Sequence, residues 1–209
     1  MAASVARGTG VFLCGVAIIA ALFLSSTAKA GVVGTGAASY CDSSSTKAFS
    51  QFGDSSNYAR LFNGGFESGS TGWGLSGGAR VVSGNEPYYL SGNRADGHSL
   101  SLPAGSSAYS GTVCFALGDW HLRFMLKRLS SSGGLRVQVV VPSVLGLLSI
   151  LDGGTVSGSG SWAPSPRMAL LLSNVTSLLG TNAVAFRFTA VNGGSFQMDD
   201  VYLDPWKCT

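Results

Sequence analysis

The chain has 209 residues, with 30 glycines, 45% hydrophobic residues and only 11% charged residues. Disordered chains combine high net charge with few aromatic side chains. This chain carries a formal charge of +3 and contains 4 Trp, 6 Tyr and 11 Phe, which excludes disorder of the whole chain. It contains no run of basic residues, which excludes a tail that binds polyanions.

The first 30 residues have the pattern of a secretory signal peptide. Arg7 precedes an apolar run at 11–24, and residues 25–30 end in small side chains at the positions that a signal peptidase reads. An apolar run of about 14 residues is shorter than the ~20 residues that cross a bilayer. We therefore expect cleavage after Ala30 and a secreted, extracellular protein that is not attached to a membrane. The remaining chain carries 11 basic and 10 acidic residues, which gives no general attraction to nucleic acid.

Residues 31–57 are mostly Gly, Ala, Ser and Thr and predict a loose N-terminal extension. Three cysteines remain after cleavage, and an exported chain can form disulfides. Alternation along the strand-like segment around Cys114 places its side chain opposite the apolar face of Val113. We expect a Cys41–Cys114 bridge across the outside of a sheet, with Cys208 free or replacing one of the two. The cysteine and histidine spacing of a zinc site is not present.

Alternating apolar and polar residues predict three long half-buried strands, at 120–127, 135–141 and 184–189. Clusters of turn residues lie between the predicted strands, at 130–134, 152–154, 157–161 and 192–195. One helix is expected, from a capping Ser173 to a stop at Gly180. Many short strands with Gly-rich turns predict an all-β fold. We expect a single antiparallel jelly-roll β-sandwich of about eight or nine strands over 58–209.

Two segments near the ends of this domain, 61–73 and 195–203, carry the most specific motifs. They resemble the opening and closing strands of the calcium-containing jelly-roll carbohydrate-binding modules, within the galactose-binding-like sandwich class. The segment 159–164 is similar to the start of a late strand in those modules, and the resemblance covers about 58–205. The chain is still more similar to small exported, uncharacterised actinobacterial proteins that pair a GGFESG-type start with an AFRF and DDVY-type end. This second resemblance implies the same fold and no function.

The resemblance implies a structural calcium ion that links the first and last strands. Calcium takes six to eight oxygen ligands, from carboxylates and backbone carbonyls. Gly65 lets the backbone turn its carbonyl toward an ion, and Glu67 supplies a carboxylate. Asp199 alternates with Val201 and is expected to face inward, where an unpaired carboxylate is costly. The alternative is that Glu67 and Asp199 are exposed or accept hydrogen bonds from backbone amides.

A set of polar side chains faces away from the predicted core in mid-strand, and it is the candidate ligand site: His121, Arg123, Arg136, Gln138 and Arg187. Arginine reads anionic or polyhydroxylated ligands through its planar fork of donors. Two alternatives are a solvated sheet face and a face covered by the 31–57 extension, in which case the arginines are structural. Trp73 and Trp120 are expected in the core, whereas Tyr88, Tyr89 and Trp162 lie near turns, where they could form an aromatic platform or pack.

Three function classes fit these patterns. The first is an exported, non-catalytic carbohydrate-binding module for a polysaccharide or envelope glycan. The second is an extracellular structural or interaction protein that uses the same sandwich for protein contact. The third is a small carbohydrate-active enzyme, which requires two convergent carboxyl groups. Glu67 with Glu86 or Asp96 is a geometrically possible pair, but no catalytic motif favours it. The sequence therefore predicts that the protein is not an enzyme. It leaves the oligomeric state open.

Overall fold

The computed structural model describes residues 44–114, 120–142, 148–170 and 183–204. The chain divides after Ala30 into two units, and all described residues belong to the second unit, 31–209. The expected helix at 173–180, both Cys41 and Cys208, and the predicted signal peptide lie outside the described residues. Within the described part of the chain, no helix is long and apolar enough to span a bilayer.

The described residues form thirteen strands and one short 3-10 helix, η1 (Ser50–Phe52). Only six strands are longer than four residues, and the short ones raise the number above the eight or nine expected from the alternation pattern. The strands are β1 (Ala59–Arg60), β2 (Gly74–Ser76), β3 (Arg80–Ser83), β4 (His98–Leu102), β5 (Ser107–Tyr109), β6 (Val113–Cys114), β7 (Trp120–Arg128), β8 (Gly134–Pro142), β9 (Leu148–Val156), β10 (Ala163–Pro164), β11 (Met168–Leu170), β12 (Ala183–Val191) and β13 (Phe196–Leu203).

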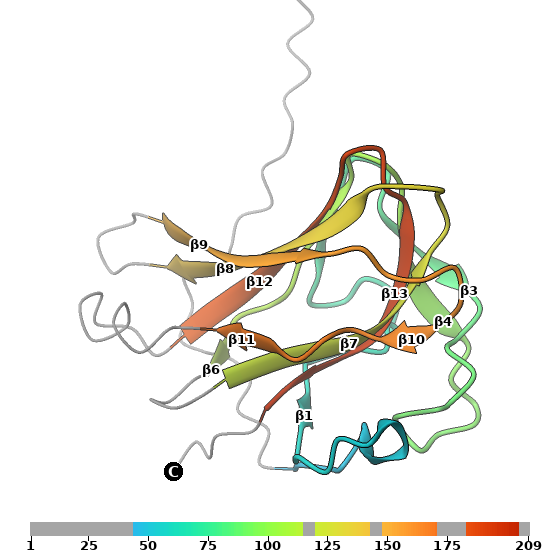
Figure 1. The fold of residues 1–209 in the computed structure, drawn as a ribbon. Helices are drawn as coiled ribbons and strands as arrows, with labels where there is room; N and C mark the ends of the chain where they lie inside the picture. Colours follow the sequence, from blue (N-terminus) through green and yellow to red (C-terminus); the bar gives the residue numbers. More distant parts are fainter. Residues whose placement is uncertain (1–43, 115–119, 143–147, 171–182, 205–209) are drawn as a thin grey trace, which may run out of the picture. The chain divides into compact units, whose positions relative to one another are not determined.

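The strands form two antiparallel sheets, which confirms the predicted all-β sandwich (Figure 1). The seven-stranded sheet has the order β10-β7-β13-β4-β3, with β1 also paired to β13 and β11 to β7. The six-stranded sheet has the order β2-β5-β12-β8-β9, with β6 also paired to β12. In Figure 1 the strands β8, β9 and β12 lie above β7, β10 and β11, so the two layers are seen from the side.

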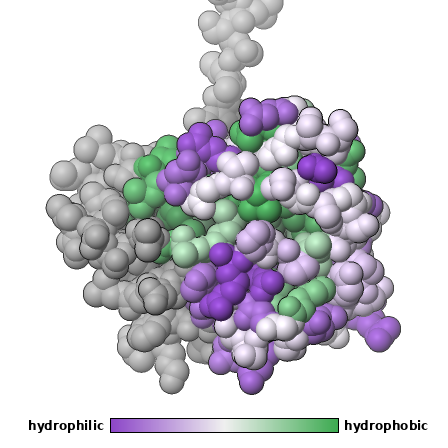
Figure 2. Space-filling model, in the orientation of Figure 1, coloured by the Kyte–Doolittle hydropathy of each residue, from purple (hydrophilic) through white to green (hydrophobic). Residues whose placement is uncertain are grey.

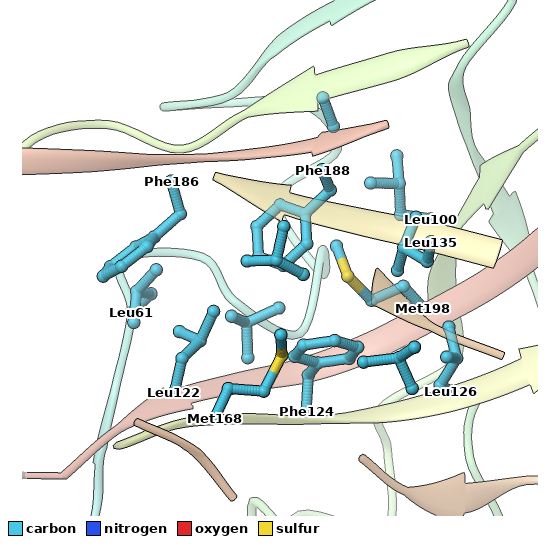
Figure 3. Close-up of a cluster of buried hydrophobic side chains, with 14 of the residues drawn as sticks. Leu61, Leu100, Leu122, Phe124, Leu126, Leu135, Met168, Phe186, Phe188 and Met198 are labelled. Atoms are coloured by element: carbon cyan, nitrogen blue, oxygen red, sulfur yellow. The ribbon is translucent and has the colours of Figure 1, made fainter. Parts of the chain in front are cut away.

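The apolar faces of the two sheets pack against each other. Phe186 and Phe188 of β12 point toward the other sheet, and the rings of Phe188 and Phe124 of β7 meet edge to face at 5.4 Å (Figure 3). Trp73 packs against Phe66 and Phe188, as expected for a core tryptophan. The apolar face of each predicted strand is buried here, because burying these side chains is the main favourable contribution to folding.

The long strands confirm the alternation pattern, and one predicted turn is wrong. The segments at 120–127, 135–141 and 184–189 lie within β7, β8 and β12. Asp152–Gly154, expected as a turn, lies inside β9, and the ladder between β8 and β9 changes register at this point. Gly154 has φ +106°, a conformation that glycine adopts without strain, so it forms a bulge in a continuous strand.

Residues 46–58, which we call the N-terminal strap, pack on the outer side of the seven-stranded sheet. Thr46 and Tyr58 exchange backbone hydrogen bonds of 2.9 and 2.7 Å, which close the ends of the strap. Phe49 and Tyr58 are fully buried in a cluster with Met125 of β7 and Tyr202 of β13. In Figure 1, η1 and β1 lie below β7, on the side away from the other sheet. The prediction of a loose extension therefore does not hold for residues 46–57.

The two end motifs lie side by side. The backbone N–H of Leu61 donates to the carbonyl of Val201 at 2.9 Å, and the N–H of Val201 donates to the carbonyl of Gly64 at 3.0 Å. A side chain at Gly64 would place its Cβ 2.7 Å from the Val201 oxygen, so this close approach requires glycine. The first and last strands of the domain are thus joined by backbone hydrogen bonds.

Candidate functional site

The two outer faces of the sandwich differ in what lies on them. On the seven-stranded sheet, the N-terminal strap and the β3–β4 loop (residues 84–97) supply Phe49, Tyr58 and Leu90 to a second apolar cluster. Trp162 and Phe52 pack against this cluster, and the exposed Tyr88 stacks edge-on against Phe52 at 4.9 Å. Tyr88 and Trp162, two of the three aromatic residues near turns, are therefore part of the packing on this face.

Arg123 is a buried structural residue of this covered face. Its guanidinium forms an ion pair with Asp54 of the strap and lies over the Phe49 ring at 4.7 Å. Its Nε donates to the Ser165 carbonyl at 3.1 Å. Burial alone would disfavour the ionised Asp54, but hydrogen bonds from Tyr58, Ser56 and Arg123 outweigh it and lower the pKa of Asp54 to about 2. The structure therefore supports the alternative in which the N-terminal extension covers this face and Arg123 is structural.

His121 also lies on the seven-stranded sheet. Its Nδ1 is 3.2 Å from Asp204 Oδ2 and 3.2 Å from Arg167 Nη2. Arg167 Nε is 3.9 Å from the Asp54 carboxylate, so these groups continue the polar network around Arg123. The prediction that His121 and Arg123 share a face with the other three site residues is wrong, because β7 belongs to one sheet and β8 and β12 belong to the other.

The structure brings Arg136, Gln138 and Arg187 together on the outer face of the six-stranded sheet. Directly opposed residues form a row across five strands, and residues that oppose each other lie on the same face. The row is Gly74 (β2), Tyr109 (β5), Arg187 (β12), Gln138 (β8) and Asp152 (β9). With neighbouring strands 4.7–4.9 Å apart, this row is about 19 Å long.

A second row beside the first is entirely polar, and it consists of Ser76, Ser107, Thr189, Arg136 and Thr155. The hydroxyls of Ser76 and Ser107 are 2.8 Å apart. Thr189 Oγ1 and Arg187 Nε, two positions apart on β12, are both buried and lack a hydrogen-bond partner. Four other side-chain atoms of the described residues are buried and lack a hydrogen-bond partner in the same way, Arg60 Nη1, Ser99 Oγ, Arg128 Nε and Asp200 Oδ1, so this property alone does not identify a ligand site.

The charged residues of this face are not equivalent. Arg136 forms a bidentate pair with Asp152, at 3.3 Å from Nε and 3.1 Å from Nη2. The hydrogen bond from Arg136 lowers the pKa of the exposed Asp152 carboxyl. Arg187 has no such partner among the described residues, and its guanidinium lies over the Tyr109 ring at 5.1 Å. Tyr109 was not among the predicted site residues, because a three-residue strand gives too short a pattern to place its side chain.

The view in Figure 2 shows hydrophilic side chains in separate patches with hydrophobic side chains between them. The described residues on this side of the molecule therefore form no single continuous hydrophilic surface. This distribution agrees with the near balance of acidic and basic residues outside the predicted signal peptide. A polyanion held only by general charge attraction would require many clustered basic residues.

The three predicted calcium ligands do not form a common cage in this structure. Glu67 accepts hydrogen bonds from the backbone of Gly97 at 3.0 Å and His98 at 2.8 Å, and its other oxygen lies 2.9 Å from His98 Nδ1. Burial opposes the ionised form, but these hydrogen bonds outweigh it and lower the pKa of Glu67. No group of three or more His, Cys, Asp or Glu side chains among the described residues is arranged to hold a metal ion.

Asp199 is buried on the side of the sheet away from the inter-sheet core. Asp200 has φ +48° and forms a bulge in β13, so Met198 and Val201 take the core positions. Asp199 accepts hydrogen bonds from the backbone of Glu86 at 3.2 Å and of Asp200 at 2.8 Å. Burial and the neighbouring Asp200 raise the pKa of Asp199 to about 9.

The positive charge at this junction comes from the chain itself. Arg60 Nη1 lies 3.5 Å from the buried Asp200 carboxylate and 3.8 Å from Asp96. The position of a Cβ on Gly65 is 3.1 Å from the same Arg60 nitrogen and 3.3 Å from Asp200 Oδ1. A guanidinium and a calcium ion would compete for this space, so the arrangement does not fit the ion. Calcium binding stays a prediction, and the chelation experiment described in the Discussion tests it.

The comparisons with known proteins concern the fold. No protein-family model matches the chain, and no curated protein matches it either. Among solved structures, the CBM22-2 xylan-binding domain from Paenibacillus barcinonensis is similar, with a TM-score of 0.50 and 13% identity, over 68% of this chain and 98% of that domain. The CBM22-1 xylan-binding domain from the same organism gives a TM-score of 0.47 and 14% identity, over 72% and 99%.

A third similar structure is the enzymatically active domain of tailspike protein 4 from bacteriophage CBA120. Its TM-score is 0.51 and its identity 10%, over 69% of this chain and only 21% of that chain. At these identities the similarity shows the fold alone. The chain thus has the β-sandwich fold of carbohydrate-binding modules, and its own residues must carry any argument on function.

Proposed function

We propose that the protein is an exported, non-catalytic glycan-binding protein and that the outer face of the six-stranded sheet is its binding surface. The observation that carries this proposal is the placement of two polar side chains of β12 on this face, the Arg187 guanidinium, stacked over an aromatic ring at 5.1 Å, and the Thr189 hydroxyl. They lie beside the Tyr109 ring and the Gln138 amide. An aromatic ring with a few convergent hydrogen-bonding groups is the composition of a sugar site.

The outer face of the seven-stranded sheet is a less favourable candidate for ligand binding. Its aromatic residues pack between the sheet and the N-terminal strap, and its arginine is paired with Asp54. A ligand there would have to displace the strap and separate a buried ion pair, which is strongly unfavourable. The similar fold of the xylan-binding domain favours a glycan over other ligands.

An enzymatic function receives no support from the carboxylates. Glu67 is held by His98 and the Gly97 amide, and Glu86 accepts hydrogen bonds from the backbone of Tyr88 and Leu90. Neither carboxylate is free to act as an acid or a nucleophile in this arrangement. Binding without catalysis is the simpler interpretation, and use of the same sandwich for protein contact is the competing function.

The proposal is tested by affinity electrophoresis on gels that contain xylan, mixed-linked β-glucan, galactan or polygalacturonate. We expect retardation on at least one gel and a loss of about tenfold in affinity for Tyr109→Ala, which removes the ring below Arg187. Tyr88→Ala is the matched control, because Tyr88 is an exposed tyrosine in the β3–β4 loop and its loss should leave binding unchanged. Absence of retardation on all four gels would contradict the proposal.

A further inference from the structure

On the proposed binding face, one positively charged side chain, Arg187, has no negatively charged partner among the described residues. Three charged side chains belong to the two rows: Arg136, Asp152 and Arg187. Asp152 is held by Arg136 through two hydrogen bonds. No carboxylate of the described residues lies within ion-pair distance of Arg187.

Arg187 is also held in place for recognition. Its guanidinium lies over the Tyr109 ring at 5.1 Å, with Gln138 opposite it on the other neighbouring strand. A flat guanidinium on an aromatic ring keeps its edge free, because stacking uses only the face of the group. Gln138 supplies an amide and Thr189 an unpartnered hydroxyl on the same face.

Three other arginines of the described residues differ from Arg187 in having an acidic partner. Arg123 pairs with Asp54, Arg60 lies near Asp200, and Arg167 lies near Asp204. Each of these three cations has an anion from its own chain, and each lies on the covered side of the molecule or at its strand junction. Arg187 lies in the polar rows of the six-stranded sheet, and its guanidinium contacts the Tyr109 ring and no carboxylate of the described residues.

We infer that Arg187 binds the carboxylate of an acidic sugar, so that the glycan recognised by this face contains uronic acid residues. A carboxylate matches the guanidinium fork with two parallel hydrogen bonds, and Gln138 and Thr189 would then bind hydroxyls of the same sugar chain. This inference rests on the proposed function and specifies its ligand. General charge attraction does not provide this selectivity, because the chain outside the predicted signal peptide is close to neutral.

The test compares polygalacturonate with its methyl ester, which has the same sugars without the charge. By isothermal titration calorimetry at fixed ionic strength, we expect wild-type protein to bind the acid form at least ~10-fold more tightly than the ester. Arg187→Gln should abolish this preference and bind both forms equally. Arg94→Gln is the matched control, since Arg94 is an exposed arginine that stacks on Tyr89 at 5.8 Å, away from the two rows.

The outcomes separate this inference from the proposed function. Equal affinity of wild-type protein for the acid and the ester, or preference for xylan over both, would overturn the uronate inference and keep the glycan-binding function. An equal loss of affinity in Arg94→Gln and Arg187→Gln would overturn it as well, because it would indicate general charge attraction. Absence of binding to all of these polysaccharides would overturn both. Matching melting temperatures of the two variants establish that folding is not the cause.

Discussion

We expect the Arg123→Met protein to be less stable than wild type by about 3–5 kcal/mol in its free energy of unfolding. Removal of one partner from a buried ion pair leaves the other charge without compensation, and this costs far more than an exposed pair. Asp54 is a buried residue of the N-terminal strap, and the Met side chain retains most of the apolar stem of Arg123. Urea unfolding followed by tryptophan fluorescence measures the difference.

Two further proteins make this prediction specific. Arg94→Met, at an exposed arginine, should stay within about 0.5 kcal/mol of wild type. The double variant Arg123→Met with Asp54→Asn should recover part of the loss, because no unpaired charge remains buried. An Arg123→Met protein as stable as wild type would mean that the strap does not depend on this ion pair.

The contribution of Asp54 has a defined pH dependence. Its pKa is lowered from 3.8 to about 2 in the folded protein, so its stabilising effect is complete above about pH 4 and is lost as the pH falls toward 2. The shift corresponds to about 2 kcal/mol. The stability difference between wild type and Asp54→Asn should therefore shrink between pH 6 and pH 2.5. A difference that is the same at both pH values would contradict this assignment.

Arg60→Met should lower the free energy of unfolding by about 2 kcal/mol. The variant leaves the buried Asp200 without its nearby cation, although the Arg60 side chain is 39% exposed and solvent screens part of the interaction. Asp200→Asn in the same chain should restore most of the stability, since it removes the charge that Arg60 compensates. Arg80→Met, at an exposed arginine of β3, is the matched control.

A chelation experiment tests whether the predicted calcium ion is bound. With Arg60 as the cation at the junction of the end motifs, a chelator should leave the melting temperature of wild-type protein unchanged. A melting temperature that falls in chelator and rises with added calcium would confirm the ion and contradict the role given to Arg60, because an ion that binds only the folded state stabilises it. In that case Asp199→Ala should reproduce the effect of the chelator.

The sequence predicts which side of each long strand faces the core, because alternation is a local property. It does not predict which sheet a strand joins, since pairing depends on residues far away in the chain. Arg123 and Arg187 have the same pattern around them, yet β7 pairs with β13 and β12 pairs with β8. Their polar sides therefore lie on opposite faces of the sandwich, and only Arg187 stays on the proposed site.

The alternation of apolar and polar residues does not predict two features of the structure. The bulge at Asp200 shifts the register of β13, so the simple alternation of Asp199 with Val201 gives the wrong side for Asp199. The N-terminal strap has few apolar residues, but Phe49 and Tyr58 suffice to anchor it, because both are completely buried. In both places a few specific tertiary contacts override the average composition of the segment.

The most direct test of the central claim is to map the surface that a sugar touches. We propose amide chemical-shift mapping of 15N-labelled protein with oligogalacturonate and, in parallel, with a xylo-oligosaccharide. The account predicts that at least one of them shifts the signals of Tyr109, Gln138 and Arg187 on the six-stranded sheet and leaves those of the N-terminal strap unchanged. Shifts confined to the strap and β7, or no shifts with either sugar, would contradict the claim that this face binds glycans.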